Sequence, residues 1–180
     1  MDHVVFQEKL RRPEPLGLSR VRLERQLLDD DGPSVLLVLA PPGSGKTTLL
    51  THVAAAQAAP VAWYRTGPED VSEAVFVRHV AEALRRAVDK PVDEPDPGVS
   101  AADAESTFGA LMGLVDRLGG RPVLLVVDDV HELASTPAEA ALERFLRLRP
   151  RSLRVLMGSR RPLTLNTPRL LVSGDFVEVD

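Results

Sequence analysis

The chain has 180 residues and no cysteine, with 44% hydrophobic and 4% aromatic residues, a mean hydropathy of -0.04 and a formal net charge of -4. The absence of cysteine excludes disulfides and thiolate metal sites, and no apolar run approaches the length of a membrane span. The charge gives no global signal for nucleic-acid binding, and so few aromatic side chains argue against a stacking platform for single-stranded nucleic acid.

Residues 1–30 are predicted to form a basic N-terminal arm that ends in a short helix. Residues 1–20 are charged and lack the apolar core of a signal peptide, so a cytoplasmic location is expected. Ser19 is predicted to cap a helix that reaches Leu28. Two interpretations of the arm remain open: a solvated segment packed beside the sheet, or one wall of a pocket for a nucleotide base.

A short apolar run that leads into a glycine-rich loop is the most informative stretch. Residues 35–40 predict a strand covered on both faces, and Pro-Pro-Gly-Ser-Gly-Lys-Thr-Thr follows directly. Gly43 and Gly45 allow the loop to turn its N–H groups inward, as a cradle for phosphate oxygens. Lys46 adds a positive charge for the β- and γ-phosphates, and the Thr47 hydroxyl can ligate Mg²⁺. The stretch matches the P-loop signature G-x-x-x-x-G-K-[ST], except that alanine replaces its first glycine.

After the loop the pattern predicts helices and a second strand. The helix that follows the loop leads to a strand at residues 61–64, Val-Ala-Trp-Tyr. Asp70-Val-Ser-Glu73 resembles a capping box with Asp70 as the cap, and it opens a helix to about Val88. Residues 89–103 are acidic and rich in proline, so we expect a surface loop there. A further helix is predicted from about Ala104 to Leu118.

The second informative stretch is residues 123–129, Val-Leu-Leu-Val-Val-Asp-Asp. Five apolar residues predict a buried central strand, and ligands of open α/β sheets bind at the carboxyl ends of such strands. An apolar run followed by Asp, downstream of a P-loop, is the Walker B pattern. In this pattern Asp128 would hold Mg²⁺, directly or through water, and Asp129 could orient or deprotonate the attacking water.

The last part of the chain is predicted to add a helix and three strands. Thr136-Pro-Ala-Glu139 is a capping box with proline at the first helical position, and its helix should run to about Arg149. Residues 154–159 predict a strand with Arg160 at its carboxyl end, where ligands bind. Residues 170–172 and 176–179 predict a terminal pair of strands.

The chain resembles a STAND NTPase in the order of its motifs: Ala-Pro-Pro-Gly-Ser-Gly-Lys-Thr-Thr, Val-Ala-Trp-Tyr, Leu-Leu-Val-Val-Asp-Asp-Val-His and Val-Leu-Met-Gly-Ser-Arg. It is most similar to the nucleotide-binding domain of MalT-type bacterial transcription regulators, which include large ATP-binding LuxR-type and large SARP-type regulators. The resemblance implies a three-layer α/β P-loop NTPase fold with a mainly parallel five-stranded sheet flanked by helices. It also implies that the strand before Arg160 lies between the P-loop and Walker B strands.

The resemblance further implies a site for ATP or ADP with Mg²⁺. In this family an arginine at the position of Arg160 senses the γ-phosphate, and the segment that contains Leu18 and Arg20 packs near adenine. The predicted nucleotide-binding residues are Leu18, Arg20, Pro42, Gly43, Ser44, Gly45, Lys46, Thr47 and Thr48. The predicted metal ligands are Thr47 and Asp128, and the predicted catalytic residues are Lys46, Asp129 and Arg160.

The expected function is a slowly hydrolysing ATP/ADP switch in a multidomain transcription regulator. The resemblance implies lid, sensor and DNA-binding domains as partners, and self-association is a further partner that we consider. We expect residues 1–180 to form a single domain that contacts no membrane and does not itself bind nucleic acid. Two alternatives remain open: a stand-alone P-loop ATPase or small-molecule phosphotransferase, and a P-loop scaffold that only mediates assembly.

Overall fold

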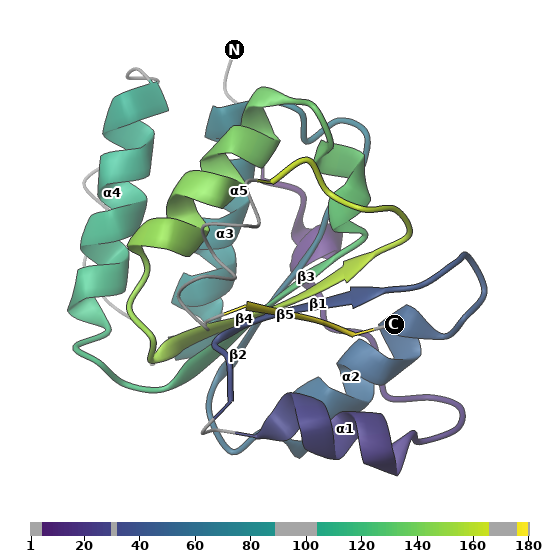
Figure 1. The fold of residues 1–180 in the computed structure, drawn as a ribbon. Helices are drawn as coiled ribbons and strands as arrows, with labels where there is room; N and C mark the ends of the chain where they lie inside the picture. Colours follow the sequence, from purple (N-terminus) through teal and green to yellow (C-terminus); the bar gives the residue numbers. More distant parts are fainter. Residues whose placement is uncertain (1–4, 30–31, 89–103, 166–175, 180) are drawn as a thin grey trace.

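Five parallel strands form the sheet at the centre of the molecule (Figure 1). The computed structural model describes residues 5–29, 32–88, 104–165 and 176–179. The order of the strands in the sheet is β2-β3-β4-β1-β5, and every neighbouring pair is parallel. The strands are β1 (Val35–Leu39), β2 (Val61–Arg65), β3 (Val123–Asp128), β4 (Leu153–Ser159) and β5 (Phe176–Val179).

The central strands are buried on both faces, which explains their composition. All six residues of β3 and six of the seven residues of β4 are buried. A parallel sheet covered on both faces favours continuous Val/Leu runs over alternation of apolar and polar residues. The predicted α/β fold is confirmed, and so is the position of β4 between β1 and β3. The strand predicted at 176–179 is β5, whereas the predictions for 89–103 and 170–172 lie outside the described residues.

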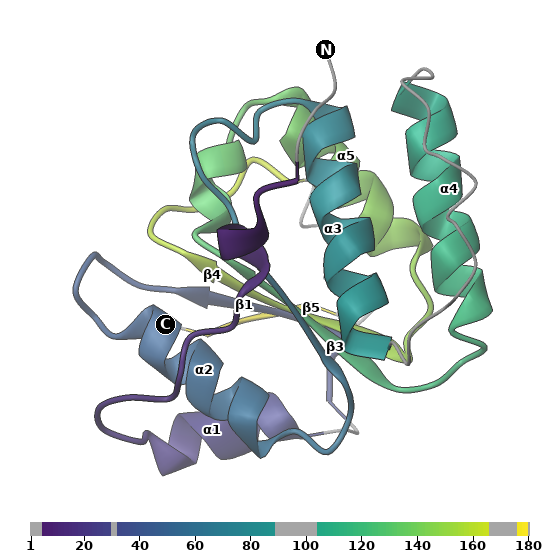
Figure 2. The ribbon, with the colours of Figure 1, turned by 180° about the vertical axis from the view of Figure 1, so that it is seen from behind.

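Helices cover both faces of the sheet. One face carries α1 (Val21–Leu28) and α2 (Lys46–Ala56). The other face carries α3 (Glu73–Val88), α4 (Ala104–Arg117) and α5 (Pro137–Leu148), as Figures 1 and 2 show. Each face has its own hydrophobic core, so the molecule has the three layers that were predicted. None of the helices in the described residues combines the length and the apolar character needed to cross a bilayer.

The predicted cap of α1 is wrong. The helix begins at Val21 with Arg20 as its N-cap, and no side chain caps it. The Ser19 hydroxyl instead donates to the carboxylate of Glu24 at 2.9 Å, and the Arg20 amide donates to the same carboxylate at 2.6 Å. Glu24 therefore satisfies a backbone donor at the start of the helix and competes for the hydroxyl that would have been the cap.

The predicted cap of α3 is also wrong, because a long-range ion pair takes the side chain of Asp70. Asp70 is fully buried and accepts hydrogen bonds from Lys9 Nζ at 2.5 Å and from the Gly67 amide at 2.8 Å. Ser72 replaces it as the cap, since its hydroxyl accepts from the Val75 amide at 3.2 Å. The predicted cap of α5 is confirmed: the Thr136 hydroxyl accepts from the amide at position 139.

The N-terminal segment, residues 5–12, packs against β2 and α3 through the short 3₁₀ helix η1 (Gln7–Leu10). The His79 ring is stacked between Phe6 and Tyr64, with ring centroids 6.2 Å and 5.1 Å away. The Phe6 amide donates to His79 Nε2 at 3.1 Å, and Nδ1 lies 2.8 Å from the Val75 carbonyl oxygen. Because Nε2 accepts a hydrogen bond, Nδ1 carries the proton and the ring is neutral.

The environment of His79 predicts a loss of stability in acid. Burial lowers the pKa of His79 below its ordinary 6.5, and the charge of Lys9 acts in the same direction, against the Val75 carbonyl, Asp70 and Glu69. As the pH falls, His79 in the unfolded chain takes up a proton before His79 in the folded protein does. The stability that the neutral ring contributes is therefore complete above pH 6.5 and is lost below it. Urea denaturation should show stability falling below that pH by at most about 1.4 kcal/mol per unit. His79→Phe should flatten this slope, and an unchanged slope would contradict the assignment.

Candidate functional site

The loop between β1 and α2 lies at the carboxyl end of the sheet. Gly43 and Gly45 have φ angles of 77° and 83°, a left-handed conformation that glycine adopts without strain. Gly45 is the N-cap of α2, and its carbonyl oxygen accepts from the Leu49 amide at 2.9 Å. The first turn of a helix has N–H groups without intrahelical partners, and these groups favour an anion.

Lys46 is folded back against this loop. Its ammonium group donates to the carbonyl oxygens of Ala40 at 2.5 Å and Pro41 at 2.8 Å. Burial lowers the pKa of Lys46, and the positive charge of Arg160 adds to the effect, while the two carboxylates of Asp129 and Asp128 oppose it. The Lys46 side chain is thus held against the loop, near the charged groups of Asp128, Asp129 and Arg160 at the ends of β3 and β4.

Asp128, the last residue of β3, is 1% exposed and has both carboxylate oxygens paired. The Thr47 hydroxyl donates to Oδ2 at 2.7 Å, and the Asp129 amide donates to Oδ1 at 3.0 Å. Burial raises the pKa of Asp128 above its ordinary value, although the hydrogen bond from Thr47 acts in the opposite direction. A divalent cation held here would favour the ionised carboxylate.

The donor set at this point fits Mg²⁺. One hydroxyl and one carboxylate are too few for an all-protein metal cage, and no group of three or more His, Cys, Asp or Glu side chains with metal-binding geometry exists among the described residues. Mg²⁺ is typically bound by one or two protein oxygens, with phosphate oxygens and waters completing its octahedron. The pair of Thr47 and Asp128 therefore suits Mg²⁺ that is bound together with a nucleotide.

Asp129 lies between two arginines at the ends of neighbouring strands. Its Oδ2 is 3.1 Å from Arg65 Nε at the end of β2, and its Oδ1 is 3.2 Å from an Arg160 terminal nitrogen just after β4. Arg160 had been singled out from the sequence, but Arg65 had not. The same rule, that charged residues at the carboxyl ends of parallel strands face the ligand, would have identified Arg65, because it ends β2 directly beside Asp128.

Most of the predicted site residues surround one open cavity of about 260 Å³. It is lined by Pro42, Gly43, Gly45, Lys46, Thr47, Thr48, Asp129 and Arg160. A Cβ atom at position 43 would meet no atom within 4 Å, so there is open space beside the loop at this position. Ser44 lies beside this cavity, in a hollow of about 20 Å³ that it shares with Arg20 and Lys46.

The two predicted residues of the N-terminal arm differ in their surroundings. The Arg20 guanidinium donates to the Ser44 carbonyl oxygen at 2.7 Å, so this side chain contacts the β1–α2 loop directly. Leu18 is 90% exposed and lines neither the cavity nor the adjoining hollow. The arm thus reaches the β1–α2 loop through Arg20.

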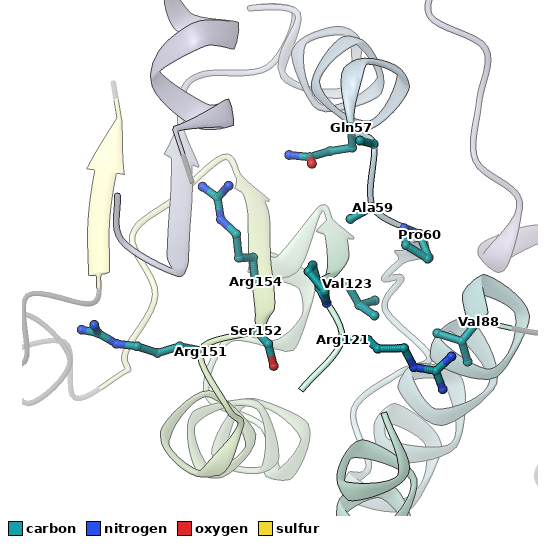
Figure 3. A pocket seen from close by; sticks show the side chains of 11 residues that line it. Gln57, Ala59, Pro60, Val88, Arg121, Val123, Arg151, Ser152 and Arg154 are labelled. Atoms are coloured by element: carbon teal, nitrogen blue, oxygen red, sulfur yellow. The ribbon is translucent and has the colours of Figure 1, made fainter. Parts of the chain in front are cut away.

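A larger cavity, of about 680 Å³, lies at the opposite end of the sheet (Figure 3). Its walls come from the turn after α2, the end of α3 and the residues that precede or begin β3 and β4, and they include none of the predicted site residues. In Figure 3 the guanidinium groups of Arg121, Arg151 and Arg154 point in different directions. These cations do not converge as a built anion site would require.

Gly158 in β4 makes room for the Asp128 carboxylate. A Cβ at this position would lie 2.8 Å from both Asp128 Oδ1 and Leu50 Cδ1. The sequence had shown Gly158 only as one residue of an apolar run. The role of Gly158 depends on the position of β4 between β1 and β3, so it follows from the order of the strands in the sheet.

Comparison with known proteins defines the family. The model of the AAA ATPase domain matches residues 20–157, so the chain belongs to the AAA ATPase domain family. Two curated relatives carry the name HTH-type transcriptional regulator MalT. The regulator of Klebsiella pneumoniae is 26% identical over 180 residues, and that of Cronobacter sakazakii is 28% identical over 181 residues. In both cases the match covers 98% of this chain and 20% of the regulator.

Solved structures show the same fold. A signal transduction ATPase with numerous domains (STAND) and a tetratricopeptide repeat sensor, from Pyrococcus horikoshii, aligns with a TM-score of 0.54 at 17% identity, covering 97% of this chain and 24% of that protein. Cdc6p from Pyrobaculum aerophilum aligns with a TM-score of 0.57 at 18% identity, covering 99% and 47%. The chain is thus similar to a MalT-like STAND ATPase domain in sequence and fold.

The close approach at Gly158 gives a test of the site geometry. Gly158→Ala should reduce the free energy of unfolding by about 1–3 kcal/mol, because its methyl group overpacks Asp128 and Leu50. Gly109→Ala is the matched control: this glycine is in α4 with open space around it, so alanine should stabilise the protein by up to about 1 kcal/mol. Chemical denaturation of both variants checks this, and equal effects would show that the Asp128 carboxylate can move away freely.

Proposed function

We propose that this chain is the ATP- or ADP-binding switch of a multidomain bacterial transcription regulator, and that it hydrolyses ATP slowly. The observation that carries the proposal is the convergence of Lys46, the Thr47–Asp128 pair and the Asp129–Arg160 pair at one end of the sheet. Membership of the AAA ATPase domain family supports nucleotide binding. The MalT regulators, of which the chain spans 20%, support a regulatory role.

The loop residues 42–48 would hold the phosphates. Lys46 would exchange the carbonyl oxygens of the loop for β- and γ-phosphate oxygens, with which it forms stronger charge-assisted contacts. Thr48, at the start of α2, would face the α-phosphate. Leu18 and Arg20 are proposed for the base side, because the arm reaches the loop through Arg20 and the exposed Leu18 offers apolar surface to an adenine ring.

Thr47 and Asp128 would hold Mg²⁺, which when bound neutralises the developing charge on the β- and γ-phosphate oxygens. Asp129 would orient the attacking water. Both of its carboxylate oxygens are engaged by guanidinium groups, so a water molecule would have to compete with Arg65 and Arg160 for them, which fits slow hydrolysis. Arg160 would sense the γ-phosphate, since it borders the phosphate cavity and its alternative partner is Asp129.

We further propose that residues 1–180 form one domain, supported by the pairing of β1 with strands from the last part of the chain. Lid, sensor and DNA-binding domains of a longer protein would be its partners, and copies of it would self-associate. DNA contacts would then belong to another domain, and the regulator would act in the cytoplasm. The multidomain character of the MalT and STAND proteins named above supports this arrangement.

Lys46→Ala tests the proposal. Removing a charge-assisted contact costs about 1.5–3 kcal/mol of binding free energy, so affinity for Mg²⁺-ATP should fall about 10- to 150-fold. Arg22→Ala, which removes an exposed cation of α1 outside the cavity, is the matched control and should bind normally. Isothermal titration calorimetry on folded protein measures both, and equal affinity of Lys46→Ala and the unchanged protein would refute the site.

Arg160 should discriminate ATP from ADP. A guanidinium near the γ-phosphate makes bidentate contacts that ADP lacks, so Arg160→Ala should weaken ATP binding by a few-fold to about tenfold and leave ADP binding nearly unchanged. Arg161→Ala is the control, because Arg161 is exposed and does not line the cavity. Parallel titrations of both nucleotides decide the matter: equal losses for ATP and ADP in Arg160→Ala would make its role structural.

A further inference from the structure

Asp129 has an unusual backbone conformation. Its φ and ψ angles are 56° and 31°, in the left-handed region, and among the described residues only Ser135 shares a positive φ without being glycine. L side chains rarely adopt this conformation, and it persists where the surrounding structure holds it. Asp129 is also the residue whose carboxylate borders the phosphate cavity, so whatever holds its backbone also sets the direction of that carboxylate.

Thr66, directly after β2, supplies this support. Its hydroxyl lies 2.7 Å from the Asp129 carbonyl oxygen and 3.1 Å from that of Asp128, and its amide donates to the Asp128 carbonyl oxygen at 3.0 Å. From the other side, the Glu132 amide donates to the Asp129 carbonyl oxygen at 3.0 Å. The Asp129 peptide is thus fixed by donors from two separate segments, and Thr66 is only 4% exposed.

We propose that Thr66 is a positioning residue for the hydrolytic reaction. By holding the carbonyl oxygen of Asp129, its hydroxyl keeps this residue left-handed and directs the carboxylate to the point between Arg65 and Arg160. Thr66 lines neither cavity at this end of the sheet, so it acts through Asp129 and not on the nucleotide. The inference rests on the role proposed above for Asp129 in orienting water.

The turn that carries Thr66 is itself anchored. The buried Asp70 carboxylate accepts from the Gly67 amide at 2.8 Å and from Lys9 Nζ at 2.5 Å. Lys9 belongs to η1, so the N-terminal segment is joined to this turn through the Lys9–Asp70 contact. These two contacts of Asp70 tie the turn that follows Thr66 to the N-terminal segment, which helps to fix the position of the Thr66 hydroxyl.

Two substitutions separate the hydroxyl from the bulk of the side chain. Thr66→Val removes the hydroxyl at nearly constant volume, and Thr66→Ser retains it. In steady-state hydrolysis of Mg²⁺-ATP, Thr66→Val should lower kcat about 10- to 100-fold and change KM and ADP affinity by less than about twofold. Thr66→Ser should restore kcat to within a few-fold. Thr107 is also a buried threonine, but it lies in α4. Thr107→Val is therefore the control, and this variant should hydrolyse ATP normally.

A second readout does not depend on hydrolysis. The ¹³Cα and ¹³Cβ chemical shifts of Asp129 report its backbone angles, so in nucleotide-free protein they should move in Thr66→Val and stay unchanged in Thr66→Ser. If Thr66→Val does not fold, Thr66→Cys, with its weak donor, takes its place. Unchanged kcat or unchanged Asp129 shifts without the hydroxyl would overturn the inference, and so would failure of serine to rescue. Absence of Mg²⁺-ATP binding by the unsubstituted protein would refute the proposed function instead, and the chemical shifts would still decide the role of Thr66.

Discussion

The hydrogen bond from Thr47 to Asp128 joins the helix that follows β1 to the end of β3, although β1 and β3 are not neighbours in the sheet. Thr47 is in the helix that follows β1, and Asp128 ends β3, while β4 runs between them. The carboxylate reaches across β4 because position 158 has no side chain. A buried carboxylate costs free energy unless its oxygens are paired, and the Thr47 hydroxyl and the Asp129 amide pair both of them. The conformation of the β1–α2 loop, the order of the strands and the position of the Asp128 carboxylate therefore depend on one another.

Charges of both signs are arranged around the cavity above the β1–α2 loop. Lys46, Arg65 and Arg160 lie near Asp128 and Asp129, so the cations have protein partners close by. An anionic ligand competes with these partners for the same cations, and its affinity is a difference between two sets of contacts. In the proposed switch, the number of phosphates would change these contacts while the sheet stays in place, because the groups that would change partners are side chains such as Lys46 and Arg160.

Local pattern predicted the strands, the loop and the α5 cap, because in each case the signal lies within a few residues. Of the two wrong caps, that of α1 had a local cause, because Glu24 in the same helix takes the Ser19 hydroxyl, whereas that of α3 had a long-range cause. Asp70 was expected to cap α3, but Lys9, 61 residues earlier, holds its carboxylate, and no local pattern reveals that partner. Thr66 and Gly158 became functional candidates only once the order of β2, β3 and β4 was known, whereas Arg65 directly follows a predicted strand and could have been found by the strand-end rule. The contact of Arg20 with Ser44 likewise depends on how the arm folds back.

The position of β1 has a consequence for how the protein forms during synthesis. β1 pairs only with β4 and β5, both of which come from the last part of the chain. While the ribosome is still adding those segments, β1 has no partner for its backbone N–H and C=O groups on either side, and such open edges invite pairing with other chains. Contacts between distant segments also form slowly. The loop that would hold the phosphates is therefore translated before β4 and β5, the strands that support it, so a nascent chain that has not yet reached them would expose the apolar residues of β1.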